Sequence, residues 1–220
     1  MRYKALLLDL DGTLADSLPV MYESYQTFLA HHRACGTIAE FTELNGPALP
    51  EVVATLRFRY GLRGDTSNLI SEYAGIILER YATHVEPNVG ARELLEAARK
   101  ARVPVALVTS AVGKHALAFL RHHHLRDYFD CMVTGEDVAR SKPDPAIYKL
   151  ALKRLQIEPK DALTVEDSRN GLLAALAAGM RPVAYGARAN DLEPDPEGVL
   201  MRISHLADVV GLIEGRLDAA

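Results

Sequence analysis

The chain has 220 residues, of which 49% are apolar and 25% are charged, and its formal net charge is −4. This balance is typical of a globular protein with a buried core and argues against a disordered or fibrous chain. The acidic charge does not favour a nucleic-acid partner, and the apolar runs are too short for a membrane span. The two cysteines, Cys35 and Cys131, are far apart in the sequence, so we expect no disulfide framework and a cytoplasmic location.

Short apolar runs, each ending in polar or glycine-containing sequence, recur along the chain and predict buried parallel strands. These runs cover residues 4–9, 103–108, 131–133, 162–165 and 182–185. Amphipathic helical patterns lie between these runs and cover residues 90–101, 113–123, 144–155 and 170–178. Gly179 suits the end of the last helix. The alternation predicts an α/β fold with a doubly wound parallel sheet, whose site lies at the carboxyl ends of the strands.

Residues 16–85 break this alternation, because they contain helical patterns, over 20–30, 51–60 and 68–81, and no convincing strand. We therefore expect a helical cap domain at 16–85, inserted into an α/β core domain made of 1–15 and 86–220. Both linkers of such an insertion lie next to each other, so the cap can hinge over the edge of the sheet as a lid.

Two carboxylates, Asp9 and Asp11, come directly after the first predicted strand. Ionised carboxylates this close repel each other unless a cation or a shared proton compensates. The pair therefore suggests a metal site, an acid/base couple, or both. The alternative is an ordinary Asp-Gly turn at Gly12 with both carboxylates in solvent.

Further polar residues follow the other strands. Thr109 and Ser110 end the second run, Glu166 and Asp167 end the fourth, and Lys142 lies on the loop before a helix. Each residue alone suits a strand end, a surface position or a helix cap. Together at one edge they offer a nucleophile, hydroxyl donors, a cation and carboxylates for a hard metal ion.

Four segments carrying these residues resemble the motifs of the haloacid dehalogenase superfamily, in the right order. They are LLLDLDGTLADS, ALVTSA, RSKPDPAIY and LTVEDSRNGLLAALAAGM. The resemblance covers the core at 1–15 and 86–186. It is closest to phosphatases with a small helical cap, a group that includes phosphoglycolate phosphatases, sugar-phosphate phosphatases and β-phosphoglucomutases.

The resemblance implies a catalytic role for three residues. Asp9 would be the nucleophile and would carry the phosphoryl group as an aspartyl phosphate. Asp11 would protonate the leaving oxygen and then deprotonate the hydrolytic water. Lys142 would offset the negative charge of Asp9 and of the phosphoryl group.

The resemblance also implies the binding residues. The phosphate would be held by Thr109, Ser110 and Lys142, and Mg²⁺ by Asp9, Asp11 through its carbonyl, and Asp167, with Glu166 as a supporting acid. The expected partner is a small phosphorylated metabolite, and the protein is expected to be a monomer or homodimer. Outside these motifs, Lys114, His115 and the run 122–124 offer weaker signals for a substrate or metal contact.

The function expected from this reading is a Mg²⁺-dependent phosphatase. One alternative is a phosphosugar mutase similar to β-phosphoglucomutase, although Met21 and Leu49 stand where those enzymes have a cap histidine and an arginine. The other alternative is a protein without enzymatic activity, either a phosphate-accepting receiver or a binding protein. Cap residues that could face the site are Met21, Tyr22, Tyr25, Asn45, Gly46 and Leu49. No motif among them identifies the substrate.

Overall fold

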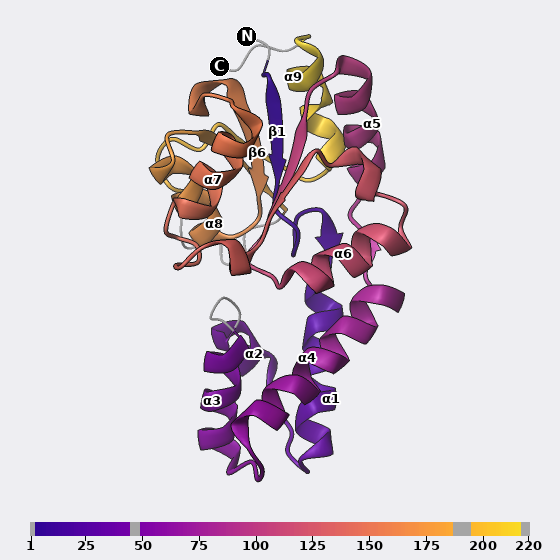
Figure 1. Cartoon of the computed structure of the whole chain (residues 1–220), viewed down its shortest axis with the longest axis vertical. Helices are drawn as coiled ribbons and strands as arrows, with labels where there is room; N and C mark the ends of the chain where they lie inside the picture. The colour runs from indigo at the N-terminus through magenta and orange to yellow at the C-terminus, as the bar shows by residue number, and fades with distance from the viewer. Residues whose placement is uncertain (1–2, 45–48, 187–194, 217–220) are drawn as a thin grey trace. The chain divides into compact units, whose positions relative to one another are not determined.

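The computed structural model describes residues 3–44, 49–186 and 195–216. The chain divides into two compact units, which are considered separately. The first unit contains residues 1–16 and 86–220, and the second contains residues 17–85. Figure 1 shows strands and flanking helices in the first unit and helices alone in the second.

The first unit is built on a six-stranded sheet in the order β5-β4-β1-β6-β7-β8. Its strands are β1 (Ala5–Leu8), β4 (Val105–Val108), β5 (Cys131–Val133), β6 (Ala162–Glu166), β7 (Arg181–Tyr185) and β8 (Met201–Ile203). All neighbouring strands in it are parallel. The sheet grows from β1 toward β5 on one side and from β6 toward β8 on the other, which confirms the doubly wound α/β fold. Strand β8 is an addition that the sequence patterns did not predict.

Helices cover both faces of this sheet and explain its unalternating apolar strands. They are α5 (Ala91–Ala101), α6 (Gly113–His122), α7 (Ala146–Leu155), α8 (Arg169–Ala177) and α9 (Val210–Glu214). Helices α7 and α8 contact each other on one side, and α5 and α9 contact each other on the other side (Figure 1). Leu7 and Val108 pack with Ile147 of α7 and Ala174 of α8. Because both faces of β1 are covered, all four of its residues are fully buried.

The second unit consists of α1 (Leu18–His31), α2 (Ile38–Leu44), α3 (Leu49–Tyr60) and α4 (Thr66–Thr83). Helix α4 packs against both α1 and α3, and Phe28 of α1 stacks on Tyr73 of α4 with ring centroids 4.7 Å apart. Asp65 caps α4 by accepting a hydrogen bond from the Ser67 N–H. The three helical patterns of the sequence are confirmed, and α2 adds a fourth helix.

The two chain segments that connect the units lie side by side within the first unit. Strand β2 (Ala15–Asp16) pairs antiparallel with β3 (Glu86–Pro87). The Asn88 side-chain amide donates to the Thr13 carbonyl oxygen at 2.8 Å, and its backbone N–H donates to the Leu14 carbonyl oxygen at 2.9 Å. The connection is thereby tied to the loop that follows β1.

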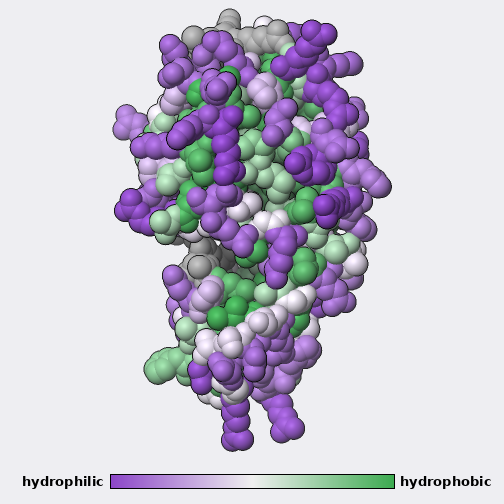
Figure 2. All heavy atoms as spheres, in the orientation of Figure 1, coloured by the Kyte–Doolittle hydropathy of each residue, from purple (hydrophilic) through white to green (hydrophobic). Residues whose placement is uncertain are grey.

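The exposed surface matches the composition. Figure 2 shows mainly hydrophilic side chains over the visible face, with smaller hydrophobic areas between them. Within the described residues, no helix has the length and apolar character needed to cross a membrane.

Candidate active site

A single lysine joins the carboxyl ends of the three central strands. Lys142 Nζ donates to Asp9 Oδ1 just after β1 at 2.6 Å, and to the Val108 carbonyl oxygen at the end of β4 at 3.0 Å. It also donates to Glu166 Oε1 at the end of β6. An ammonium group has three N–H donors, so these three acceptors fix its position completely. The structure thus brings Asp9, Lys142 and Glu166 together, as the sequence predicts.

Glu166 is fully buried and is held from several sides. Its Oε1 accepts hydrogen bonds from Lys142 and from the Tyr148 hydroxyl, the latter at 2.5 Å, and its Oε2 accepts from the Ser168 hydroxyl at 3.1 Å. A Cβ atom at Gly171 would lie 2.0 Å from Glu166 Oε2. Both carboxylate oxygens are engaged and helix α8 packs closely on them, which suits the supporting role that the sequence gives Glu166.

Asp167 faces the loop that follows β1. The Thr13 hydroxyl donates to Asp167 Oδ1 at 3.1 Å. Gly12 has a φ of +80°, and a Cβ atom there would lie 2.2 Å from Asp167 Oδ2. The DxDGT loop therefore needs glycine at position 12 both for its backbone conformation and to let the Asp167 carboxylate approach.

Burial and mutual repulsion shape the charges of this cluster. Burial and the nearby Glu166 raise the pKa of Asp9 well above its usual range, although Lys142 opposes the shift. Burial and Glu166 also raise the pKa of Asp167, to about 7. Burial lowers the pKa of Lys142, but Asp9 and Glu166 outweigh it and raise that pKa, so Lys142 stays charged. One lysine thus faces three carboxylates, and a further cation would stabilise the ionised form of the cluster.

Three of these carboxylates are close enough to hold a metal ion. Oxygen atoms of Asp9, Glu166 and Asp167 lie within 4.8 Å of one another. Hard oxygen ligands of this kind suit Mg²⁺. Since Lys142, Tyr148 and Ser168 occupy the oxygens of Glu166, the donor set fits a metal ion on the side of Asp9 and Asp167.

The remaining predicted residues also follow strand ends. Thr109 is buried directly after β4, and its Oγ1 accepts a hydrogen bond from the Ala111 N–H at 3.0 Å, which leaves the hydroxyl hydrogen available as a donor. Ser110 is exposed and next in the chain. Asp11 is half-buried in the loop after β1, where it forms an isolated bridge with Ala15.

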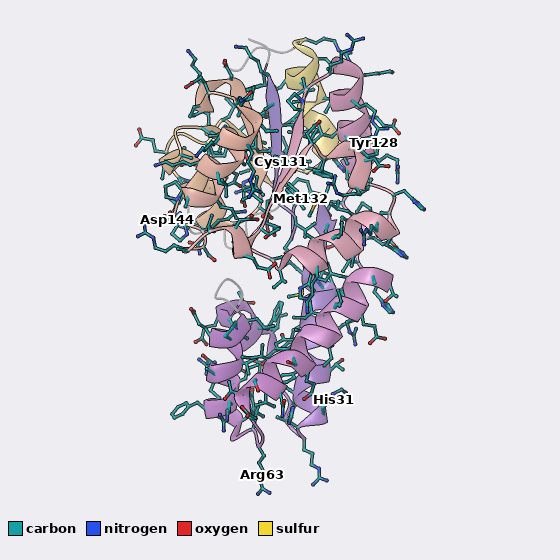
Figure 3. All side chains as sticks on the ribbon, viewed as in Figure 1. His31, Arg63, Tyr128, Cys131, Met132 and Asp144 are labelled. Carbon is teal, nitrogen blue, oxygen red and sulfur yellow. The ribbon has the colours of Figure 1, made fainter. Side chains whose placement is uncertain are left out.

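Several other sequence signals have structural explanations. Asp144 Oδ1 accepts a hydrogen bond from the Ala146 N–H at the start of α7, and Figure 3 shows Asp144 well apart from Cys131 and Met132 of β5. His115 is buried in α6, whereas Lys114 beside it is exposed. His123 packs its ring against Phe119. The histidine run ends α6, with residues 122 and 124 exposed.

The cap residues proposed to face a substrate are only partly described. Tyr25 is buried within the second unit and donates its hydroxyl to Glu40 Oε2 at 2.5 Å. Met21, Tyr22 and Leu49 are half-buried. Asn45 and Gly46 lie outside the described residues.

Sequence reasoning did not assign a role to Thr13, Tyr148 or Ser168, although all three lie inside the quoted motifs. Each contacts a carboxylate through a side-chain hydroxyl. Tyr148 follows Lys142 by six positions, a spacing that crosses from a loop into a helix and has no fixed geometry in the sequence. Ser168 could have been found as a residue preceding a helix.

These features define the class of protein, a doubly wound α/β enzyme with a buried lysine and carboxylates at the carboxyl edge of its sheet. The family model described as haloacid dehalogenase-like hydrolase matches residues 6–185, more than half of the chain. The chain therefore belongs to the haloacid dehalogenase-like hydrolases.

Relatives in this family are named as phosphatases. A phosphorylated carbohydrates phosphatase of Thermotoga maritima is 34% identical over 193 residues, which cover 83% of this chain and 84% of the relative. Hexitol phosphatase A of Escherichia coli is 32% identical over 205 residues, which cover 86% of each chain. The crystal structure of CbbY from Rhodobacter sphaeroides in complex with phosphate matches with a TM-score of 0.82 and 26% identity, over 94% of this chain and 96% of that one.

Proposed function

We propose that this protein is a Mg²⁺-dependent phosphatase that hydrolyses a small phosphorylated sugar or related metabolite through an aspartyl phosphate on Asp9. The observation that carries the proposal is the contact of 2.6 Å between Lys142 Nζ and Asp9 Oδ1, beside the carboxylates of Glu166 and Asp167. A buried lysine next to a carboxylate allows an anionic phosphate to approach a nucleophile that would otherwise repel it.

The chain's own residues divide the reaction between them. The free oxygen of the Asp9 carboxylate attacks phosphorus while the ester oxygen leaves with a proton from Asp11, so an alcohol and an aspartyl phosphate form. Asp11 then takes a proton from water as the water oxygen attacks phosphorus. The bond between phosphorus and Asp9 breaks, and inorganic phosphate and the free carboxylate result.

Binding and charge balance fall to the neighbouring residues. Thr109 and Ser110 hold phosphate oxygens, and Lys142 neutralises part of the charge on Asp9 and the phosphoryl group. Asp9, the Asp11 carbonyl oxygen and Asp167 would hold Mg²⁺, and Glu166 keeps Lys142 in place. When bound, Mg²⁺ supplies positive charge that stabilises the phosphoryl oxygens.

The substrate class is inferred from the relatives. Phosphatases of phosphorylated carbohydrates, hexitol phosphates and fructose 1-phosphate are all similar to this chain. A related CbbY structure contains xylulose 1,5-bisphosphate. A panel of sugar, sugar-alcohol and short-chain phosphate monoesters, assayed for phosphate release with Mg²⁺, tests this class. Turnover of phosphoglycolate in preference to every sugar phosphate would contradict it.

A net phosphatase is favoured over a phosphosugar mutase. Met21 and Leu49, which stand at the positions of the mutase histidine and arginine, cannot bind a second phosphate by charge. Two cap arginines have partners within the second unit, since Arg57 Nη1 donates to Thr66 Oγ1 and Arg59 contacts Glu43. Incubation with β-glucose 1-phosphate and a bisphosphate activator should give no efficient production of glucose 6-phosphate.

The nucleophile is tested by Asp9→Asn. The amide cannot form an acyl phosphate, so we expect a folded protein with no steady-state phosphatase activity. Phosphate release by the purified variant, with its thermal unfolding midpoint as a control for folding, is the measurement. Near wild-type turnover would remove the basis for the proposed function.

A further inference from the structure

Tyr148 is a buried side chain of α7 whose contacts lie in the lysine and carboxylate cluster. It has 0% exposure, and its hydroxyl donates to Glu166 Oε1 at 2.5 Å. Lys142 Nζ lies 5.2 Å from the centre of its ring. The residue belongs to a hydrophobic core cluster that also contains Leu7, Val108 and Ala174. The buried ring therefore holds the hydroxyl in a fixed position within the cluster.

The oxygen that Tyr148 contacts is the one that Lys142 also contacts. Glu166 Oε1 accepts from both groups, whereas Oε2 accepts from Ser168. A second donor on Oε1 reduces the negative charge that this oxygen presents to the ammonium group. Lys142 is thereby shared between Glu166 and Asp9 instead of being drawn toward Glu166 alone.

We propose that Tyr148 is a positioning residue, whose hydroxyl holds Glu166 and thereby keeps the Lys142 ammonium on the Asp9 carboxylate. This inference rests on the proposed function for its effect on turnover, but the placement of Lys142 is tested independently of it. The hydrogen bond of the Tyr148 hydroxyl goes to Glu166 and not to Asp9. Its action is through Glu166 and Lys142.

The first test is Tyr148→Phe, which retains the ring in the core and removes the hydroxyl. A hydrogen bond to a charged group contributes about 1.5–3 kcal/mol, so we expect kcat to fall by about 10- to 100-fold. KM should change by less than kcat, because Thr109 and Ser110, which hold phosphate oxygens in the proposed function, are untouched. A Phe variant with wild-type kcat would overturn the inference.

Two comparisons separate positioning from packing. Tyr73→Phe, a buried tyrosine in the second unit stacked on Phe28, is the matched control and should leave kcat unchanged. In a Glu166→Gln background, Tyr148→Phe should lower kcat by less than about threefold, because the effects of residues that act through one another are not additive. If Tyr148→Phe lowered kcat in that background as much as it does in the wild type, Tyr148 would act through packing alone and the inference would be overturned.

The last measurement does not depend on activity. In a crystal structure of Tyr148→Phe, Lys142 Nζ should lie farther from Asp9 Oδ1 and remain on Glu166, whereas an unchanged set of three lysine contacts would overturn the inference. If wild-type protein shows no phosphatase activity, the proposed function fails while this structural test still decides the role of Tyr148. If Tyr148→Phe does not fold, 4-aminophenylalanine can replace Tyr148, because it keeps the ring and an N–H donor. This variant should retain the three contacts of Lys142. Loss of those contacts would overturn the inference.

Discussion

Asp9 and Asp11 differ in their surroundings, and that difference separates their proposed roles. Asp9 is buried and bound to Lys142, whereas Asp11 is half-buried in the loop after β1. A nucleophile gains from a fixed position, and an acid/base group needs access to protons on substrate and water. Their surroundings therefore suit the two different tasks that we propose for them.

Replacing Asp11 with Asn tests the acid/base role. The amide can neither give nor accept the required proton, so we expect kcat to fall by about 10²- to 10⁴-fold. Substrates with a good leaving group, such as p-nitrophenyl phosphate, should lose less in the first step than alkyl phosphates. An equal loss for both leaving groups, with a normal thermal midpoint, would argue against protonation of the leaving oxygen by Asp11.

The raised pKa of Asp167 predicts a pH dependence of Mg²⁺ binding. Its pKa is raised to about 7 by burial and by Glu166, so in the metal-free protein a proton occupies the carboxylate below that pH. Under the proposed function Mg²⁺ displaces this proton, so its affinity should fall as the pH decreases below about 7, and the raised pKa of Asp9 should add to the dependence. Calorimetric titration with Mg²⁺, repeated at steps of about one pH unit between pH 5.5 and 8.5, measures this dependence.

The same shift sets the sign of a stability effect. A carboxyl group whose pKa is raised on folding contributes most below its unfolded pKa, and that contribution is lost as the pH rises through about 7. Added Mg²⁺ should therefore raise the unfolding midpoint more at high pH than at low pH. Asp167→Asn is the control and should remove most of this metal-dependent stabilisation. A pH-independent effect of Mg²⁺ would contradict the assignment of Asp167 as a ligand.

At the scale of elements, the site depends on how each strand ends and each helix begins. Helix α8 starts at Arg169, and Ser168 before it is the N-cap, whose hydroxyl accepts a hydrogen bond from the Gly171 N–H at 3.1 Å. The same hydroxyl donates to Glu166 Oε2. Ser168 thus links the end of β6 to the start of α8 and orients Glu166, the last residue of β6.

Ser168→Ala should consequently lower stability more than catalysis. Loss of an N-cap costs about 1 kcal/mol of unfolding free energy, which corresponds to ~2–4 °C in the midpoint for a chain of this size. The lost donor is on Oε2, and the Glu166 oxygen that contacts Lys142 keeps its partners. Thermal unfolding and kcat measured on the same preparation test this. An unchanged midpoint would mean that the cap contributes nothing to α8.

At the scale of the whole molecule, the two connections between the units are the natural place for a hinge. Strands β2 and β3 pair next to each other, and Asn88 ties them to the loop that carries Thr13. We propose that residues 17–85 close as a cap over the site by rotation near residues 15–17 and 84–88. Closure would exclude bulk water and add contacts to the substrate.

Solution scattering tests the closure. With Mg²⁺ and orthovanadate added together, we expect the radius of gyration to decrease relative to the free protein. Asp167→Ala, which should not retain the metal, is the control and should keep the larger radius under the same conditions. Identical scattering of the wild type with and without these ligands would remove the support for a moving cap.

Most strands of the core and several residues of the candidate site could be predicted from sequence patterns alone. Unalternating apolar runs predicted the central parallel strands, and glycine at positions 12 and 179 marked the end of a strand and of a helix. Asp9 and Glu166 could be placed together because parallel strands have their carboxyl ends at one edge, and the family resemblance added Lys142 from a loop. Local periodicity and strand order carry that information without any knowledge of side-chain contacts.

How these residues share charge depends on contacts that the sequence patterns do not specify. It shows that Lys142 reaches three strand ends at once, and that Glu166 has both oxygens occupied by Lys142, Tyr148 and Ser168. The short strand β8 and helix α2 were also missed. Hydrogen bonds between residues far apart in sequence depend on packing, and short elements are stabilised by their neighbours more than by their own pattern.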